Sequence, residues 1–279
     1  MTLVLYSGEP GAFAEDAVLD AFGDTDRRGL PGFRPVFDAV SAGEAAAGVV
    51  PIENLVGGSV RENYDLLLEH DLEVVGEVVV PVSLCLAAAP GHRLEEIERV
   101  YSHIQALGQA EHFLRNRGWE LLTTYNTAGA GKRIGEDGER GSAALLSPRA
   151  AGLFGLEILA RDVADAPDNR TRFLAIARPG ATLPRWVAAV RQDWRTLLAF
   201  GVRNEPGSLL AALRAFAARG LNLSRLESRP SRAGPWEYVF WADLDADVSA
   251  PAATAALEEI GRVAAMVRVL GSYPRPADD

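Results

Sequence analysis

The chain has 279 residues, of which 48% are hydrophobic and 24% charged, and its formal net charge is −10. A chain of this length and composition can bury a large core, in two domains or in one large one. The negative charge argues against broad binding to nucleic acid or to an anionic membrane surface, and it leaves room for a local basic cleft that binds a small acid.

Cys85 is the only cysteine, so no intrachain disulfide can form and a reducing cytoplasm is the simplest location. The N-terminus opens on an apolar strand-like run, Leu3–Tyr6, without the basic segment and apolar core of a signal peptide. No stretch approaches the roughly 18 apolar residues that span a bilayer. The sequence predicts a cytoplasmic protein with no membrane partner.

The sequence offers few candidate residues for metal binding, cofactor binding or covalent catalysis. The histidines have no ligand-like spacing, and Lys132, the only lysine, lies beside Arg133 rather than in an apolar setting that would favour a Schiff base. There is no G-x-S-x-G motif, and Cys85 lies inside an apolar run. His103 alone lies in a strand-to-helix turn, where a structural role is favoured over general-acid work. We expect no metal and no cofactor.

Short apolar runs alternate with amphipathic stretches in the first 81 residues. The expected strands are Thr2–Tyr6, Arg34–Phe37, Val49–Ile52 and Val74–Val80, and the expected helices are Ala12–Phe22, Ala39–Ala47 and Arg61–His70. This alternation predicts a mostly parallel sheet covered on both faces. Two glycine-bearing turns, Ser7–Gly11 and Pro51–Val60, follow strands at the edge where open α/β sheets bind ligands, although ordinary turn chemistry explains either turn alone.

Residues 82–165 read as a second α/β unit inserted into the first. The expected strands are Val82–Ala88, Val100–His103, Leu121–Tyr125, Ser142–Leu146 and Leu156–Leu159. The expected helices are Leu94–Glu98, Gln105–Arg117, a helix with its N-cap in Asn126-Thr127-Ala128 that runs through Ile134, and Pro148–Phe154. If the following strand at Thr171 returns to the first sheet, the chain crosses twice between two lobes that enclose a cleft.

That returning strand begins with Asp168-Asn169-Arg170-Thr171-Arg172-Phe173 and continues into an apolar run, Leu174–Ala177. Arginine can clamp a carboxylate through two parallel hydrogen bonds, and a neighbouring threonine can donate to a developing oxygen charge. In isolation the hexapeptide is more often a polar strand edge with a spare arginine.

A boundary follows at Arg178–Pro184, which contains two prolines and a glycine. Beyond it the expected strands are Leu197–Val202, Leu221–Leu226, Tyr238–Asp243 and Val267–Leu270, with helices at Ser208–Ala218 and Ala252–Ala265. This βαββαβ order is ferredoxin-like and says little about function by itself.

Five blocks of sequence resemble the prephenate dehydratase family in the family's own order. They are Tyr6–Ala17 (YSGEPGAFAEDA), Gly48–Val60 (GVVPIENLVGGSV), Tyr101–Gln109 (YSHIQALGQ), Asn169–Phe173 (NRTRF) and, in the last domain, Asn204–Leu210 together with Leu221–Pro230 (LNLSRLESRP). The last pair resembles the regulatory ACT domain of these enzymes. The resemblance covers nearly the whole chain.

The resemblance implies a two-lobed catalytic region of the periplasmic-binding-protein type over residues 1–178, with lobe one at 1–81 and 166–178 and lobe two at 82–165. A linker at 179–195 and an ACT domain at 196–279 complete the expected organisation. The implied activity is the cofactor-free, decarboxylating dehydration of prephenate to phenylpyruvate in phenylalanine biosynthesis, which is a carbon–oxygen lyase reaction. Arogenate dehydratase and a non-catalytic amino-acid or keto-acid sensor are the alternatives.

By the same resemblance Thr171 donates to the leaving oxygen, Arg172 holds a carboxylate and Phe173 walls the ring. The rest of the cleft would be lined by Asn54, Ser59, Ser102, Gln105 and Thr127. The implied effector is phenylalanine, bound by Asn204, Gly207, Ser208, Leu209, Leu210, Asn222, Glu227, Ser228 and Arg229. Pairing of ACT domains implies a homodimer or a homotetramer.

The chain departs from the family pattern at several positions in these blocks. They are Ala14, Ile104 in place of proline, the run Leu55–Gly58, and Ser208 and Leu210 in the effector element. Ile104 is expected to loosen the turn before Gln105, and Ser208 adds a hydroxyl to the effector pocket. The absence of a chorismate mutase segment before the first strand predicts a monofunctional enzyme.

Overall fold

The structure is a computed structural model that describes residues 2–230 and 238–277. The chain forms two compact units. The first comprises Met1–Asp71 and Val78–Ala188, and the second comprises Leu72–Glu77 and Ala189–Asp279. No helix in the described residues is long and apolar enough to cross a membrane.

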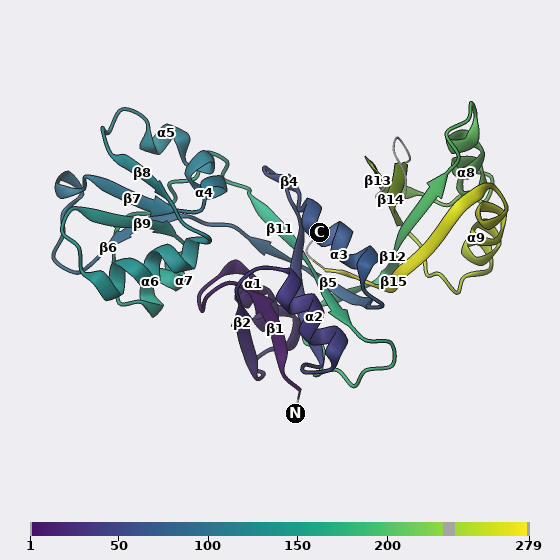
Figure 1. Cartoon of the computed structure of the whole chain (residues 1–279), viewed down its shortest axis with the longest axis horizontal. Coiled ribbons are helices and arrows are strands. Elements are labelled where there is room, and N and C mark those ends of the chain that lie inside the picture. Colours follow the sequence, from purple (N-terminus) through teal and green to yellow (C-terminus); the bar gives the residue numbers. More distant parts are fainter. Residues whose placement is uncertain (1, 231–237, 278–279) are drawn as a thin grey trace. The chain divides into compact units, whose positions relative to one another are not determined.

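The first unit contains two sheets, one in each lobe (Figure 1). The strands of lobe one are β1 (Val4–Ser7), β2 (Arg27–Leu30), β3 (Ala47–Asn54), β4 (Gly58–Ser59), β5 (Glu73–Pro81) and β11 (Arg170–Ala177). Its helices are α1 (Phe13–Phe22), α2 (Arg34–Ala42) and α3 (Arg61–Glu69). The sheet order is β2-β1-β3-β11-β5, and β4 pairs with β3. β5 begins in residues of the second unit and ends in residues of the first.

The sheet of lobe one is mixed, which corrects the expectation of a mostly parallel sheet. β2, β1 and β3 run parallel, but β11 pairs antiparallel with β3. The reason is that the chain comes back from lobe two, so β11 enters the sheet from the opposite end. The expected double crossing between the lobes is thereby confirmed.

One local prediction in lobe one is wrong, and one strand of this lobe was not predicted. Arg34–Phe37 is the first turn of α2 rather than a strand; Pro35 suits the start of a helix, and Val36, Phe37 and Val40 are buried together at helical spacing. The edge strand β2 was missed because its sequence, RRGL, shows no apolar alternation.

Lobe two is built on the sheet β10-β6-β9-β7-β8. Its strands are β6 (Cys85–Ala88), β7 (Arg99–Ser102), β8 (Glu120–Thr123), β9 (Ser142–Leu146) and β10 (Glu157–Ala160). Its helices are η1 (Leu94–Glu96), α4 (Ile104–Gln109), α5 (Glu111–Leu114), α6 (Thr127–Asp137) and α7 (Pro148–Leu153). The single helix expected over Gln105–Arg117 is two short helices, because the backbone at Ala110 leaves the helical region.

Alternation along β6 places two apolar clusters on opposite faces of that sheet (Figure 1). Cys85 and Ala87 join one cluster with α6 and α7, whereas Leu86 and Ala88 join the other with α4 and α5. Within the predicted cap segment Asn126-Thr127-Ala128, it is Asn126 that caps α6, by accepting a hydrogen bond from the Gly129 amide at 2.6 Å.

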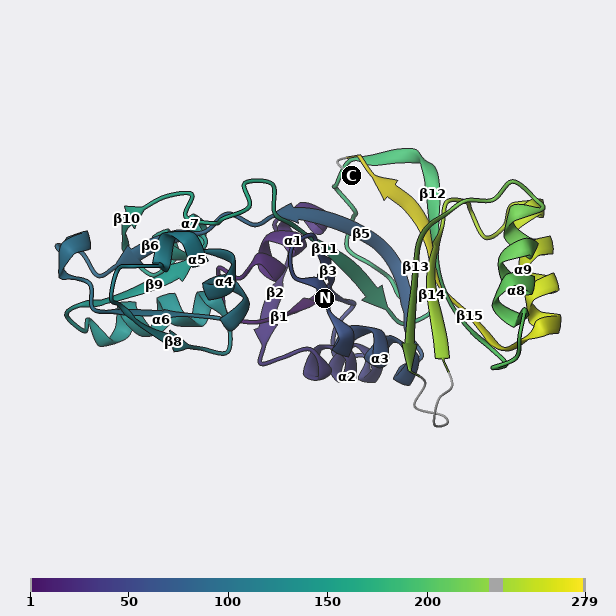
Figure 2. The ribbon, with the colours of Figure 1, turned by 90° about the horizontal axis from the view of Figure 1, so that it is seen from above.

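The second unit has the expected βαββαβ order. Its elements are β12 (Val190–Val202), α8 (Ser208–Ala217), β13 (Leu223–Pro230), β14 (Tyr238–Leu244), α9 (Pro251–Val263) and β15 (Ala264–Pro276). The sheet order is β13-β14-β12-β15 with antiparallel neighbours, and α8 and α9 cover one face (Figure 2). β12 starts at Val190, so residues 190–195 of the expected linker are strand.

Candidate active site

The candidate site begins where the end of β3 meets the start of β11. Thr171 pairs with Asn54 and Arg172 with Glu53 in the antiparallel register, and the register shifts before Phe173. This pairing joins two of the sequence blocks, 117 residues apart, at one edge of the lobe-one sheet.

Asn54 is the centre of the polar contacts at this edge. Its Nδ2 donates to Thr171 Oγ1 at 2.9 Å, to Asn169 Oδ1 at 2.8 Å and to the Arg170 carbonyl at 3.1 Å. Two of these acceptors, Asn169 and Thr171, are only 3% and 8% exposed. The amide of Asn54 therefore fixes both side chains in place.

The other end of the same amide organises the loop that follows. Asn54 Oδ1 accepts from the backbone amides of Val56 at 3.0 Å and Gly57 at 2.6 Å. It also accepts, at 3.4 Å, from Nε2 of Gln109, which lies on α4 of lobe two. Both Nδ2 and Oδ1 of Asn54 are therefore hydrogen-bonded, and the bonds to Oδ1 hold the loop 55–58 against the end of β3.

The Thr171 hydroxyl is set up as a donor. Since it accepts from Asn54 Nδ2, its own hydrogen must point elsewhere, and among the described residues it has no acceptor. A threonine hydroxyl does not ionise near neutral pH, so it can act as a positioned hydrogen-bond donor but not as a free acid. This is the arrangement required beside a departing oxygen.

Arg172, Ser59 and Glu53 lie around the same strand ends. Arg172 and Ser59 are each half-buried, and each pairs in register with Glu53, on β11 and β4 respectively. The structure thus brings Asn54, Ser59, Thr171 and Arg172 to one region of lobe one, as expected from the motifs.

Ser102 and Phe173 do not present their side chains to solvent. Ser102 is fully buried and its hydroxyl donates to the Leu145 carbonyl at 2.6 Å, while Phe173 is only 2% exposed. In this conformation both side chains are buried, and their expected contact with substrate stays a prediction. Both strands are covered on both faces, since Val100–Ser102 of β7 and Phe173–Ala177 of β11 are buried at consecutive positions.

The turns of lobe two carry the remaining predicted residues. Gln105 is exposed in the first turn of α4, and its backbone amide donates to Nδ1 of His103 at 3.3 Å. Burial lowers the pKa of His103, which favours the neutral ring that can accept this bond. His103 is therefore a helix cap in this structure, and Thr127 is the half-buried first residue of α6.

Two polar residues at the site lie inside the motif blocks, but the sequence assigned them no role. Asn169 opens the Asn169–Phe173 block and Gln109 closes the Tyr101–Gln109 block. Both bond to Asn54, which strand pairing and helix placement make possible and the linear sequence does not show.

Two observations on the described residues concern the single cysteine and groups of metal-ligating side chains. Burial raises the pKa of the Cys85 thiol to about 11, so it is not a reactive thiolate. Within residues 2–230 and 238–277, no group of three or more His, Cys, Asp or Glu side chains is placed to hold a metal ion.

The predicted effector residues lie in two segments of the second unit. Gly207, at φ +86°, caps α8, whose next residues are Ser208, Leu209 and Leu210; Leu209 packs on the apolar core and Leu210 is 63% exposed. Glu227, Ser228 and Arg229 alternate along the edge strand β13.

Two further effector candidates lie beside these segments. Asn204 is exposed in the turn before α8. Asn222 donates to Asp245 at 2.7 Å.

Comparison with known families assigns both parts of the chain. The sequence model of the prephenate dehydratase family matches residues 4–181. The chain belongs to this family. The model of the ACT domain matches residues 196–262. The predicted family, the two-lobed α/β fold with a βαββαβ domain, and the carbon–oxygen lyase class are confirmed.

Relatives and solved structures extend over nearly the full length. The chain is 38% identical over 285 residues to arogenate dehydratase/prephenate dehydratase 1, chloroplastic, of Arabidopsis thaliana, covering 97% of this chain and 71% of the relative. Prephenate dehydratase from Arthrobacter aurescens, solved in complex with L-Phe, is 32% identical with a TM-score of 0.87, covering 99% of this chain and 92% of that one.

A second solved protein is described as GqqA, a novel type of quorum quenching acylase. It is 33% identical with a TM-score of 0.86, covering 99% of this chain and 98% of that chain.

Proposed function

We propose that the chain converts prephenate to phenylpyruvate, carbon dioxide and water, with Thr171 as the donor to the leaving hydroxyl. The carrying observation is the Thr171 hydroxyl, which accepts from Asn54 and so directs its hydrogen away from the strand pair. The bond from the ring to its carboxylate breaks, its electrons enter the ring, and the C4–oxygen bond breaks as the ring becomes aromatic. The departing hydroxide leaves as water once it has gained a proton.

The other residues bind and orient a substrate with two carboxylates. Arg172 clamps one carboxylate by a charge-assisted pair of hydrogen bonds. Asn54 holds Thr171, and Ser59, Gln105 and Thr127 supply polar groups on the two sides of the cleft. Phe173 and Ser102 keep β11 and β7 in place. Aromatisation drives the step, so the protein needs to orient the substrate and stabilise the leaving oxygen.

The division of the chain follows from these roles. We assign residues 1–178 to catalysis, with lobe one at 1–81 and 166–178 and lobe two at 82–165, and residues 196–279 to the ACT domain. The connecting segment 179–195 ends in the first residues of β12. The grouping of Leu72–Glu77 with the second unit modifies this scheme at one strand.

We propose phenylalanine as the effector, bound by the predicted residues of the β12–α8 turn and of β13. The support is the ACT domain match together with the L-Phe complex of the Arthrobacter aurescens enzyme. We also propose a homodimer or homotetramer, and a cytoplasmic location on the basis of a single, buried cysteine. Calorimetry with phenylalanine and light scattering after gel filtration test the first two proposals.

The decisive experiment is incubation of the pure, folded protein with prephenate while phenylpyruvate absorbance is recorded, with and without phenylalanine. Turnover above the acid-catalysed background supports the proposal. Folded protein that binds phenylalanine without turnover indicates a sensor instead, and refutes it.

Arogenate is the second candidate substrate, because several relatives carry the name arogenate dehydratase. It differs from prephenate by an amino group in place of the keto group. Comparing kcat/KM for the two substrates decides the preference, and a ratio above about tenfold toward arogenate would reassign the activity.

A further inference from the structure

The turn between β1 and α1 is docked into lobe two, although it belongs to lobe one. Ala12 is buried within the apolar cluster of α6 and α7. Gly11, at φ +86°, comes so close to α7 that a Cβ built on it would lie 2.9 Å from Ala150. The Ser147 hydroxyl donates to the Gly11 carbonyl at 3.3 Å. This turn is therefore a contact point between the two lobes.

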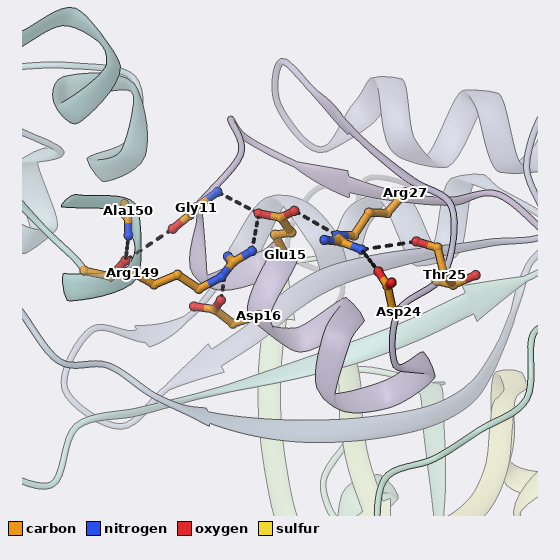
Figure 3. Close-up of polar contacts among 9 residues, drawn as sticks. Gly11, Glu15, Asp16, Asp24, Thr25, Arg27, Arg149 and Ala150 are labelled. Carbon is orange, nitrogen blue, oxygen red and sulfur yellow. Dashed lines mark hydrogen bonds and ion pairs between the residues drawn. The ribbon is translucent and has the colours of Figure 1, made fainter. Parts of the chain in front are cut away.

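Glu15 is the side chain that fixes this turn (Figure 3). Its carboxylate accepts from the Gly11 amide at 2.7 Å, from Arg27 Nε at 2.8 Å and from Arg149 Nη2 at 3.0 Å. Arg27 lies on β2 of lobe one, whereas Arg149 lies on α7 of lobe two. One buried carboxylate thus ties the turn to its own lobe and to the other lobe.

Arg149 reaches two carboxylates at once, since its Nη1 also pairs with Asp16 at 2.7 Å (Figure 3). The planar guanidinium can present two nitrogens to two acceptors, which a lysine ammonium cannot do with the same geometry. A second set of contacts lies nearby. Glu9 accepts from the Tyr125 hydroxyl at 2.7 Å and pairs with Lys132 at 3.2 Å.

We propose that these residues form an interlobe clasp that sets the spacing of the two lobes, with Glu15 and Arg149 as positioning residues for the dehydratase reaction. The clasp consists of Glu9, Glu15, Asp16, Tyr125, Lys132 and Arg149. The inference rests on the proposed function for its kinetic consequence, but the spacing itself is measurable without turnover.

The basic side chains of the clasp are partly exposed to solvent. Glu15 is buried, with 8% of its side chain exposed, but Arg149 and Lys132 are 37% and 42% exposed. The clasp also borders a surface cavity lined by Glu9, Glu15 and Tyr125 among other residues. Ion pairs of this exposure contribute about 1 kcal/mol or less, so they bias the spacing of the lobes without locking it.

A kinetic signature follows from this bias. If the cleft binds substrate only at the clasped spacing, weakening the clasp lowers the fraction of competent molecules and raises KM in proportion. The bound complex reacts as before, because the hydrogen bonds of the clasp residues go to partners other than Thr171 and Asn54. The expected change is therefore in KM rather than in kcat.

Arg149→Lys is the test and Arg27→Lys is its matched control. Both variants replace an arginine that pairs with the Glu15 carboxylate, but only Arg149 connects the two lobes. We expect Arg149→Lys to raise KM about three- to tenfold with kcat within twofold of wild type. Arg27→Lys should leave both constants within twofold, even if the two variants melt at similarly reduced temperatures.

The spacing is measured directly by energy transfer between dyes on Glu62→Cys and Glu120→Cys, exposed positions on α3 and β8. Cys85 is fully buried and stays unlabelled. Arg149→Lys should lower or broaden the transfer, and Arg27→Lys should not. If Arg149→Lys does not fold, Tyr125→Phe, which removes the bond to Glu9, takes its place.

Equal behaviour of the two arginine variants in both measurements would overturn the clasp. A wild-type protein without dehydratase turnover would instead contradict the proposed function, while the energy-transfer comparison would still decide the clasp.

Discussion

Two buried polar clusters, one in each unit, are built on opposite principles. In the first unit Asn54, Asn169 and Thr171 are neutral and joined by hydrogen bonds of 2.8 to 2.9 Å. In the second unit Glu77 forms an ion pair with Arg195 and accepts from the Tyr273 hydroxyl at 3.2 Å, with Glu77 fully buried and Arg195 7% exposed.

We interpret the neutral cluster as part of a functional site and the charged cluster as a structural contact. The neutral cluster lies at a strand end and keeps a hydroxyl hydrogen available, so it can serve a substrate. The charged cluster holds Leu72–Glu77 against the sheet of its unit, where Gly271 meets the Val74 carbonyl so closely that no side chain would fit between them. Breaking the first should affect catalysis, and breaking the second should affect stability.

Loss of the buried charge pair should give the largest effect. Glu77→Gln replaces the buried carboxylate of the Glu77–Arg195 ion pair with a neutral amide, and we expect a loss of about 3–5 kcal/mol in the free energy of unfolding. Tyr273→Phe removes one hydrogen bond and should cost about 1 kcal/mol. Denaturant unfolding of the two variants checks the ranking, and a loss below about 1 kcal/mol for Glu77→Gln would show that the pair is not a stabilising structural contact.

Thr171→Val should have the opposite effect, with a large loss of catalysis and little change in stability. It keeps the shape of the side chain and removes the donor, so kcat should fall about 10²- to 10³-fold while phenylalanine binding and unfolding stability change little. Thr171→Ser retains the hydroxyl and serves as the control. Steady-state kinetics and calorimetry measure the two properties, and a Thr171→Val enzyme of undiminished kcat would remove Thr171 from its assigned role.

Asn54→Asp tests how the donor is oriented. A carboxylate cannot donate to Thr171 Oγ1, and it invites the threonine to donate to it instead. We expect kcat/KM to fall about 10- to 100-fold, corresponding to one well-placed buried hydrogen bond. Gln109→Ala, which removes only the 3.4 Å contact to Asn54, should have a smaller effect. A larger loss for Gln109→Ala would show that the bridge between the lobes matters more than the orientation of Thr171.

Low pH should weaken the hydrogen bonds and ion pairs of Glu15 and Glu9 in the interlobe clasp. Burial acts to raise the pKa of Glu15, but the Gly11 amide and the guanidinium groups of Arg27 and Arg149 outweigh it and hold the pKa below its usual range. The hydrogen bond from Tyr125, followed by Lys132, likewise lowers the pKa of Glu9. Because these pKa values are lower in the folded state, the stabilisation is present at neutral pH and is lost as the pH falls below about 4.

Thermal unfolding of wild type and Glu15→Gln across pH measures the stabilisation that the ionised Glu15 carboxylate contributes. We expect a difference of about 1 kcal/mol near pH 7, which is the smallest of the four effects. The two curves should converge in acid. On the alkaline side they should stay parallel, because the pKa of Tyr6, raised first by burial and then by Glu15, and that of Tyr125 are both about 12. A difference that grows in acid would contradict the assigned sign.

Much of the fold was readable because local signals agreed with the final structure. Ser142–Leu146 was predicted residue for residue, Asn126 caps α6, and the six elements of the second unit occur in the predicted order. The misses lie where local signals are weak. β2 has no apolar alternation, and Arg34–Phe37 begins a helix because α2 buries Val36, Phe37 and Val40 on one face.

The sequence by itself determined the family, the chemical inventory and the Thr171–Arg172 pair at the start of a strand. Only the tertiary structure decided what those residues contact. Pairing of β11 with β3 brought Asn54 to the Thr171 hydroxyl, and packing against both faces of the two sheets buried Phe173 and Ser102. Docking of the β1–α1 turn gave Glu15 a partner 134 residues away. Residue identity fixes which bonds a side chain can make, whereas long-range packing fixes which partner is close enough to make them.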